Sequence, residues 1–171
     1  SLGVIHDGEH YVVRGKKVIV ATGAKENYMA FPGSTLPGVM GAGAAQTMVN
    51  VNRVLPGKRV VMLGSGNVGL IVSYQLMQAG ADVVALVEAA PKIGGYAVHA
   101  GKLRRAGVPI LVGHTITRVT GDGQVERVEI AQVDKQFHPI PGTERILEAD
   151  TVCLAVGLNP MTELVWMAGC K

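Results

Sequence analysis

The feature that most constrains the fold of this 171-residue chain is a glycine turn between an apolar run and an amphipathic segment. The apolar run covers residues 59–63, and residues 64–69 follow it with the spacing Gly-x-Gly-x-x-Gly. The pattern then predicts a helix over 67–79 and a second strand over 82–87, which ends at Glu88. A strand, a glycine turn, a helix, a strand and an acid in this order are typical of a dinucleotide-binding βαβ unit.

The three glycines of the turn have different physical tasks. Gly64 lets the chain leave the strand sharply, Gly66 leaves room for a pyrophosphate near the backbone, and Gly69 permits close packing of helix and strand. The unpaired N–H groups of the first helical turn would point at the anion, together with the positive end of the helix dipole. We expect no catalytic residue and no metal ligand in the chain. The residues expected to contact a cofactor are Gly64, Ser65, Gly66, Asn67, Val68, Gly69, Glu88, Ala89 and Gly157.

The acid at the end of the second strand bears on the choice of nucleotide. The carboxylate of Glu88 can accept hydrogen bonds from the adenosine ribose hydroxyls, and it would repel the additional phosphate of NADP. We therefore expect NAD(H), while Lys92 lies close enough in the sequence to keep NADP open. The alternative for Glu88 is an acid that ends a strand simply by facing water.

Composition argues against several other classes of protein. The net charge is +3, aromatic residues make up 4%, and the basic residues are scattered, so the chain has no nucleic-acid footprint. No apolar run is long enough to span a membrane. Cys153 and Cys170 do not form a Cys-x-x-Cys pair, so neither a redox dithiol nor a zinc site is expected. We expect Cys153 to pack inside an apolar strand, and the reducing cytoplasm is the expected compartment.

The remaining pattern predicts an α/β fold with a central parallel sheet. Wholly apolar strands such as 59–63 and 82–87 are typical of parallel sheets that are covered on both faces. Val68, Ile71, Val72, Leu76 and Met77 are the expected buried side of the first helix. The other expected elements are a hairpin over 4–13, a buried strand over 17–24, helices over 43–54 and 97–106, a parallel strand over 108–112, antiparallel strands over 114–119, 125–133 and 145–148, and a buried strand over 150–156.

Two of these apolar strands end alike. Residues 18–23 and residues 151–157 both finish in a small residue, any residue and a glycine. Placed around a Gly-x-Gly-x-x-Gly unit, this pair resembles the pyridine nucleotide–disulfide oxidoreductase superfamily of flavoproteins, from about Lys17 onwards. In that superfamily an NAD(P) domain is inserted into an FAD domain. The resemblance implies a Rossmann-like three-layer domain with a central parallel sheet and a β-meander crossover.

The resemblance also implies a division of the chain. Residues 1–30 would be a hairpin and strand left over from the FAD domain, and 31–57 a linker loop and helix. Residues 58–157 would be the NAD-binding domain, and 158–171 an exit segment towards the FAD domain. A complete enzyme of the superfamily needs a second Gly-x-Gly-x-x-Gly motif for FAD. Gly41-Ala42-Gly43 lacks the third glycine of that motif, so we expect this chain to be a piece of a larger flavoenzyme.

The loop before the first helix narrows the resemblance to a branch of the superfamily. Phe31-Pro32-Gly33, Leu36-Pro37-Gly38 and residues 42–46 are similar to the flavoprotein subunits of sarcosine, opine and related amine oxidases, and to oxidoreductases linked to glycerol 3-phosphate. The alternative is a proline-glycine loop that merely caps a helix. Disulfide reductases of the superfamily usually carry a glutamate where this chain has Ile71, so we do not expect this chain to reduce disulfides.

The function implied by the resemblance is hydride transfer between nicotinamide and flavin in the parent enzyme. This chain would hold NAD(H), while FAD would bind to the rest of the parent. Its partners would be the FAD domain and further subunits. One alternative is a stand-alone NAD-binding regulatory module without turnover. Another is a small single-domain dehydrogenase, which is disfavoured because the chain has no Tyr-x-x-x-Lys pair.

Overall fold

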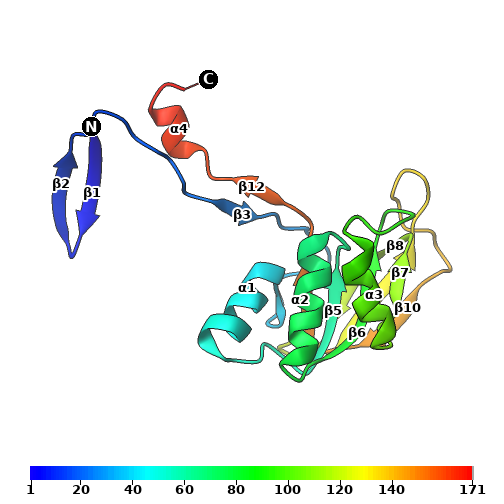
Figure 1. Cartoon of the computed structure of the whole chain (residues 1–171). Helices are drawn as coiled ribbons and strands as arrows, with labels where there is room; N and C mark the ends of the chain where they lie inside the picture. The colour runs from blue at the N-terminus through cyan, green and yellow to red at the C-terminus, as the bar shows by residue number, and fades with distance from the viewer. Residues whose placement is uncertain (171) are drawn as a thin grey trace. The chain divides into compact units, whose positions relative to one another are not determined.

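The computed structural model describes residues 1–170 and divides into two compact units. The larger unit extends from Glu26 to Leu158 and contains the glycine turn (Figure 1). The smaller unit combines residues 1–25 with the segment that begins at Asn159. Among residues 1–170, no helix has both the length and the apolar character needed to cross a membrane.

A five-stranded parallel sheet forms the centre of the larger unit, in the order β4-β11-β5-β6-β7. Its strands are β4 (Val39–Gly41), β5 (Arg59–Leu63), β6 (Asp82–Glu88), β7 (Ile110–Val112) and β11 (Thr151–Leu154). The α/β class and the central parallel sheet predicted from the sequence are therefore confirmed. Strand β4 was not predicted, because its three residues follow a proline-glycine loop and are too few to show a periodicity.

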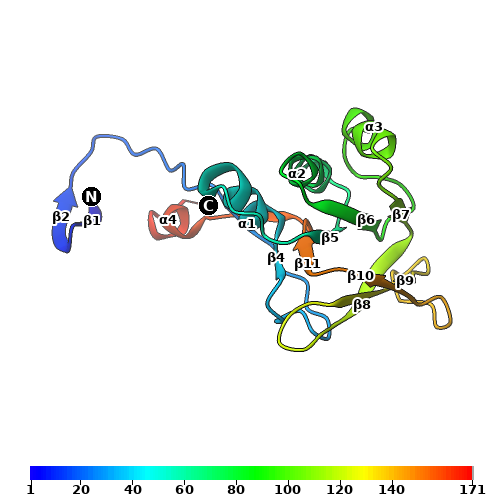
Figure 2. The ribbon, with the colours of Figure 1, turned by 90° about the horizontal axis from the view of Figure 1, so that it is seen from below.

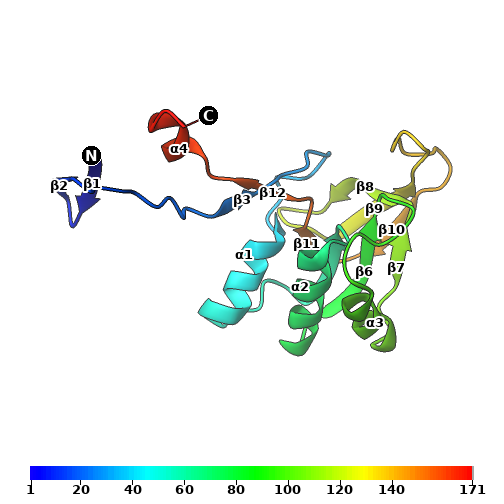
Figure 3. The same cartoon turned by 45° about the horizontal axis from the view of Figure 1, so that its top comes forward.

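Helices cover one face of this sheet, and an antiparallel meander covers the other (Figures 2 and 3). The helical layer consists of α1 (Ala42–Thr47) with the π-helix η1 (Met48–Asn52), α2 (Asn67–Gln78) and α3 (Ala97–Arg105). The meander consists of β8 (His114–Thr120), β9 (Arg127–Gln132) and β10 (Arg145–Glu148), in the order β10-β9-β8. The predicted three-layer arrangement with a β-meander is thus confirmed.

The alternation of side chains along β5 produces two separate cores. Val60 and Met62 pack into the cluster on the helical side, where Leu76 of α2 is also buried. Val61 and Leu63 pack into the cluster on the meander side. Because successive side chains of a strand point to opposite faces, a wholly apolar strand is what a sheet covered on both faces requires.

Three expectations about helices and strands were wrong. Residues 17–24 do not form a buried strand: only β3 (Ala24–Glu26) forms, and Ile19 is 91% exposed, because no sheet in residues 1–170 covers these side chains. The helix over 43–54 is divided into α1 and the π-turn η1, which stops at the left-handed Arg53. Val68 is 39% exposed, because it lies in the first turn of α2 beyond the covered part of the helix.

The smaller unit contains the hairpin predicted near the start of the chain. It is formed by β1 (Leu2–His6) and β2 (Glu9–Val13), which pair in antiparallel register. Asp7 and Gly8 both have positive φ, as a tight two-residue hairpin turn requires. The helix α4 (Glu163–Met167) also belongs to this unit. Strand β12 (Leu158–Pro160) pairs with β3 in a two-stranded sheet.

Candidate nucleotide-binding site

The first and third glycines of the turn are required by the packing of the chain itself. Gly64 has a φ of +105°, and a Cβ atom there would lie 2.3 Å from the carbonyl oxygen of Ala155. A Cβ atom on Gly69 would lie 2.0 Å from the carbonyl oxygen of Gly64. The N–H of Gly64 donates to the carbonyl oxygen of Val87 over 2.8 Å, which ties the turn to the end of β6. Helix α2 and strands β5, β6 and β11 therefore meet at this turn.

The second glycine is not required by any contact within the chain. Gly66 has extended backbone angles (φ −62°, ψ 172°) that any residue can adopt, and a Cβ atom there would have no neighbour within 4 Å. It is the N-cap residue of the twelve-residue helix α2, and no side chain caps that helix. An uncapped helix N-terminus with open space at the cap is the geometry that holds a phosphate against backbone N–H groups.

The carboxylate of Glu88 is bound to the glycine turn. Its Oε2 atom accepts hydrogen bonds from the backbone N–H of Ser65 at 2.8 Å and from the Ser65 hydroxyl at 2.6 Å. Its Oε1 atom accepts from the backbone N–H of Ala90 at 2.8 Å. These three bonds fix the acid at the end of β6, beside the turn. They were not predicted, because strand patterns do not show where an end-of-strand carboxylate will point.

The loop between β6 and α3 folds back over the same turn. The N–H of Gly94 donates to the Ser65 hydroxyl at 3.0 Å, and the N–H of Gly95 donates to the Ser65 carbonyl oxygen at 2.8 Å. The N–H of Tyr96 donates to the side-chain oxygen of Asn67 at 2.9 Å. The side chains of Ser65 and Asn67 therefore hold the site together. The amide nitrogen of the Asn67 side chain takes no part in these bonds.

A first cavity, of about 210 Å³, opens where the glycine turn faces the end of β11. The structure brings several of the predicted residues together here. Gly157 has a φ of +108°, and its carbonyl oxygen accepts a hydrogen bond from the N–H of Asn27 at 2.9 Å. The lining residues are Glu26, Gly66, Asn67, Val68, Ala155, Gly157 and Leu158.

Glu26 in this cavity was not among the residues predicted from the sequence. Its carboxylate accepts hydrogen bonds from the N–H groups of Gly43 at 2.6 Å and Ala44 at 3.2 Å, at the start of α1. A Cβ atom on Gly41 would lie 2.1 Å from Oε2 of Glu26. The Gly41-x-Gly43 pair therefore encloses a carboxylate of the chain itself, and a phosphate would meet a negative charge there.

A second cavity, of about 300 Å³, lies immediately beyond the end of β6. Among the predicted residues it contains Ala89. The meander contributes the loop that follows β9, which no sequence pattern connects with the site. The lining residues are Ala89, Pro91, Gly113, Val133, Asp134, Lys135 and Phe137. Of the predicted cofactor residues, Gly66, Asn67, Val68 and Gly157 thus line the first cavity and Ala89 lines the second.

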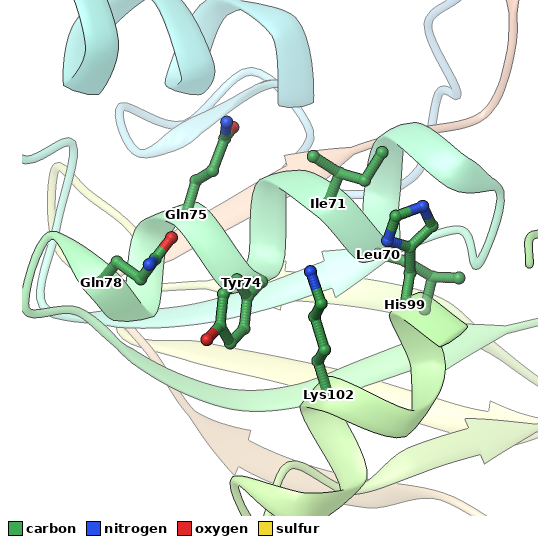
Figure 4. Close-up of a pocket in the computed structure, with 7 residues that line it drawn as sticks. All are labelled: Leu70, Ile71, Tyr74, Gln75, Gln78, His99 and Lys102. Atoms are coloured by element: carbon green, nitrogen blue, oxygen red, sulfur yellow. The ribbon is translucent and has the colours of Figure 1, made fainter. Parts of the chain in front are cut away.

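A third groove, of about 340 Å³, lies between the outer faces of α2 and α3 (Figure 4). Ile71 of α2 is among the residues that line it. The ammonium group of Lys102 lies 5.2 Å from the centre of the Tyr74 ring, a cation–π contact between the two helices. The residues that line this groove include no carboxylate and no glycine, and none of the predicted cofactor residues is among them.

The cysteine of strand β11 is not a reactive thiolate. Cys153 is buried in β11, and burial, with a smaller effect of the Glu26 charge, raises its thiol pKa to about 12. Cys153 is therefore a neutral thiol at physiological pH, and it packs as predicted. Cys153 and Cys170 are both free. Because the thiolate is the nucleophile in disulfide exchange, the Cys153 thiol is not activated for that reaction.

Comparison with known proteins identifies the family. A family model described as pyridine nucleotide-disulphide oxidoreductase matches residues 3–171. The chain belongs to this family. It is 29% identical to the HcnB subunit of hydrogen cyanide synthase from Pseudomonas aeruginosa, over 98% of the chain. It is 30% identical to an opine oxidase subunit of Agrobacterium tumefaciens, over 99% of the chain. The alpha subunit of sarcosine oxidase from Rhizobium meliloti is also similar, with 29% identity over 94% of the chain.

The chain corresponds to only a part of these family members. It spans 40% of the length of the HcnB protein, 36% of the opine oxidase protein and 15% of the sarcosine oxidase protein. The family and the resemblance to sarcosine and opine oxidase subunits, both predicted from the sequence, are confirmed.

Solved structures of the family share the fold. Thioredoxin reductase of T. acidophilum superposes with a TM-score of 0.77 at 24% identity, over 99% of this chain and 52% of that one. An FAD-dependent pyridine nucleotide-disulphide oxidoreductase of Desulfovibrio vulgaris gives a TM-score of 0.67 at 26% identity, over 95% of this chain and 41% of that one. The chain is therefore a domain of the type found in flavin-dependent oxidoreductases.

Proposed function

We propose that this chain is the NAD(H)-binding domain of an FAD-dependent oxidoreductase. The observation that carries the proposal is the open space at Gly66. Gly64 and Gly69 are explained by contacts within the chain, whereas Gly66 has none to explain it. A glycine that the fold does not need, at the uncapped N-terminus of α2, fits a pyrophosphate resting on the backbone.

The other residues of the site have roles consistent with this placement. The hydrogen bonds to Ser65 and Ala90 fix the carboxylate of Glu88 at the end of β6, where it can accept from the adenosine ribose. The cavity that contains Val68 and Gly157 would receive the nicotinamide half. When bound, the nicotinamide supplies or accepts a hydride, and the FAD that we assign to the rest of the parent enzyme is its redox partner. The residues of this chain bind and orient the cofactor.

The relatives support an assignment within a larger assembly. Those named above are each described as a subunit of an oxidase or synthase, and each is much longer than this chain. We therefore place an FAD domain and further subunits around this domain in the parent enzyme. Hydride transfer between nicotinamide and flavin is the reaction we assign to that enzyme.

Calorimetric titration with NADH tests the proposal. We expect the wild-type chain to bind NADH and Gly66→Val to bind it at least about tenfold more weakly, because a branched side chain would fill the phosphate cradle. The thermal unfolding midpoint should change little, since this Cβ position is open. Gly3→Val is the matched control: Gly3 also has no atom within 4 Å of its Cβ position and lies in the hairpin. Undiminished binding by Gly66→Val would place the phosphate site elsewhere.

A further inference from the structure

The loop that follows β9 holds an aromatic residue in an unusual backbone conformation. Phe137 has a φ of +65°, in the left-handed region that bulky residues rarely adopt. Within residues 1–170, the other non-glycine residues with positive φ are Asp7 and Arg53. The Phe137 side chain is also 59% exposed, so packing of its ring in the core does not explain the conformation.

A set of hydrogen bonds imposes this conformation. The carboxylate of Asp134 accepts from the N–H groups of Gln136 and His138, both at 2.9 Å. The N–H of Phe137 donates to the Asp134 carbonyl oxygen at 3.1 Å, and the N–H of Asp134 donates to the His138 carbonyl oxygen at 2.9 Å. The hydrogen bond from the His138 N–H is the main cause that lowers the pKa of Asp134. The chain is thus closed into a tight loop with the Phe137 ring on its outside. Strain held in this way by surrounding contacts is common at functional sites.

The ring stands at the cavity beyond β6. Phe137 lines this cavity of about 300 Å³ together with Ala89 and Pro91, which closely follow Glu88 in the chain. Backbone hydrogen bonds connect the loops around it: the N–H of Gly113 donates to Ala90 at 3.0 Å, and the N–H of Val133 donates to Gly113 at 2.9 Å. The cavity therefore begins one residue away from the carboxylate that we assign to the adenosine ribose.

We propose that Phe137 forms the stacking wall of an adenine-binding cavity. This inference rests on the proposed function. With the pyrophosphate at Gly66 and the ribose at Glu88, the next group of the dinucleotide is a planar, largely apolar ring. The adjoining cavity has a partly exposed aromatic ring on one side and Ala89 and Pro91 in its lining. A purine face stacks favourably on an aromatic side chain. The hydrogen-bonded loop fixes the backbone that carries the ring before the ligand arrives, which reduces the entropy lost on binding.

The test uses ADP-ribose and NADH as probes, with two variants of the same position. Phe137→Asn removes the ring but suits the left-handed backbone, because asparagine tolerates it better than phenylalanine does. We expect about tenfold weaker binding of both probes, from the loss of one base-stacking contact. The thermal unfolding midpoint should be unchanged or higher. Phe137→Tyr keeps a ring and should bind as the wild type does. Tyr11→Ala, which removes an exposed aromatic from the hairpin, is the control.

Proton NMR of bound ADP-ribose provides a readout that a purely structural role would not change. Ring currents of a stacked phenylalanine should shift the adenine H2 and H8 signals upfield in the wild type, and this shift should be lost in Phe137→Asn. If Phe137→Asn leaves the affinity or the adenine H2 and H8 shifts unchanged, Phe137 does not stack on the adenine, while the proposal that the chain binds NAD(H) still stands. Weaker binding with a markedly lower unfolding midpoint would also overturn it, since the ring would then serve the loop. If the wild type binds neither probe, both the adenine wall and the proposed function fail.

Discussion

The backbone N–H and the hydroxyl of Ser65 both donate to the same carboxylate oxygen of Glu88, at 2.8 and 2.6 Å. This pair connects the carboxyl ends of β5 and β6, and the Ser65 hydroxyl also accepts from the N–H of Gly94. The acid that the sequence suggests as a cofactor ligand or as a water-facing strand end is therefore part of the framework of the turn. Both roles are compatible, because a carboxylate has more acceptor positions than these bonds use.

Replacing this acid should affect stability and nucleotide preference together. Glu88→Gln has one acceptor oxygen where the wild type has two, so we expect a loss of about 1–2 kcal/mol in the free energy of unfolding, measured with urea. Removing the negative charge should also narrow the preference for NADH over NADPH in calorimetric titration. Ser65→Ala is the control, since it removes the hydroxyl contact and leaves the charge. An NADH to NADPH ratio that is the same in the wild type and Glu88→Gln would remove Glu88 from the ribose site.

The third glycine of the turn should tolerate no side chain. In Gly69→Ala the new methyl group would meet the carbonyl oxygen of Gly64, a backbone atom that can move only with the turn. We expect the free energy of unfolding to fall by about 2–4 kcal/mol. Gly101→Ala makes the same change within α3, where the nearest atom is the flexible end of Arg105 at 3.4 Å. It should be neutral or stabilising by roughly 0.5–1 kcal/mol, and equal losses in the two variants would contradict the packing role of Gly69.

The buried thiol should make stability depend on pH in the alkaline range. The pKa of Cys153 rises from 9.0 to about 12 in the folded chain. Between these values the unfolded state has lost a proton that the native state keeps, so the stabilising contribution is complete below about pH 9 and is lost as the pH rises towards 12. Cys153→Ala should be less stable at neutral pH because of the cavity it leaves.

The decisive quantity is the difference in slope between the two proteins. Above pH 9 the unfolding free energy of the wild type should fall more steeply than that of Cys153→Ala, by up to about 1.4 kcal/mol per pH unit. Urea unfolding at about pH 9.5 and about pH 11 measures both slopes. Parallel pH profiles would show that the thiol is not the group responsible.

The purified chain should contain no flavin. The Gly41-x-Gly43 pair is occupied by the Glu26 carboxylate, which is bound to the N–H groups of Gly43 and Ala44, so it cannot serve as a phosphate site for FAD. We therefore expect no visible absorbance band, before or after incubation with FAD and gel filtration. A yellow protein with the absorbance of bound flavin would contradict this assignment.

The elements that could be predicted from the sequence are those whose partners lie in the same unit. Residues 59–63 form β5, because the neighbouring strands β11 and β6 of the same unit pair with this apolar run. Residues 17–24 have an equally apolar pattern, yet they are exposed, since residues 1–170 provide no sheet to cover them. Apolar patterns show that a segment needs burial, but they do not show whether the chain supplies the covering surface.

The sequence predicted the part of the candidate site that lies at the glycine turn, but not the residues that distant segments contribute. The glycine spacing located the turn, because Gly64 and Gly69 are each required by a close local contact. Glu26 and Phe137 were missed, because they reach the site from distant segments through contacts that no local period records. The Asp134–His138 loop has the sequence of an ordinary polar turn, and only its hydrogen bonds show that it holds a strained aromatic residue.

The ends of the larger unit have a consequence for how such a domain can be exchanged between proteins. Strands β3 and β12, through which the chain enters and leaves, are paired, and the N–H of Asn27 donates to the carbonyl oxygen of Gly157 at 2.9 Å. Paired strands lie about 5 Å apart, so a host protein can accept or lose everything between them without stretching its own backbone. The larger unit is therefore joined to the rest of a protein through two adjacent strands that form a single point of attachment.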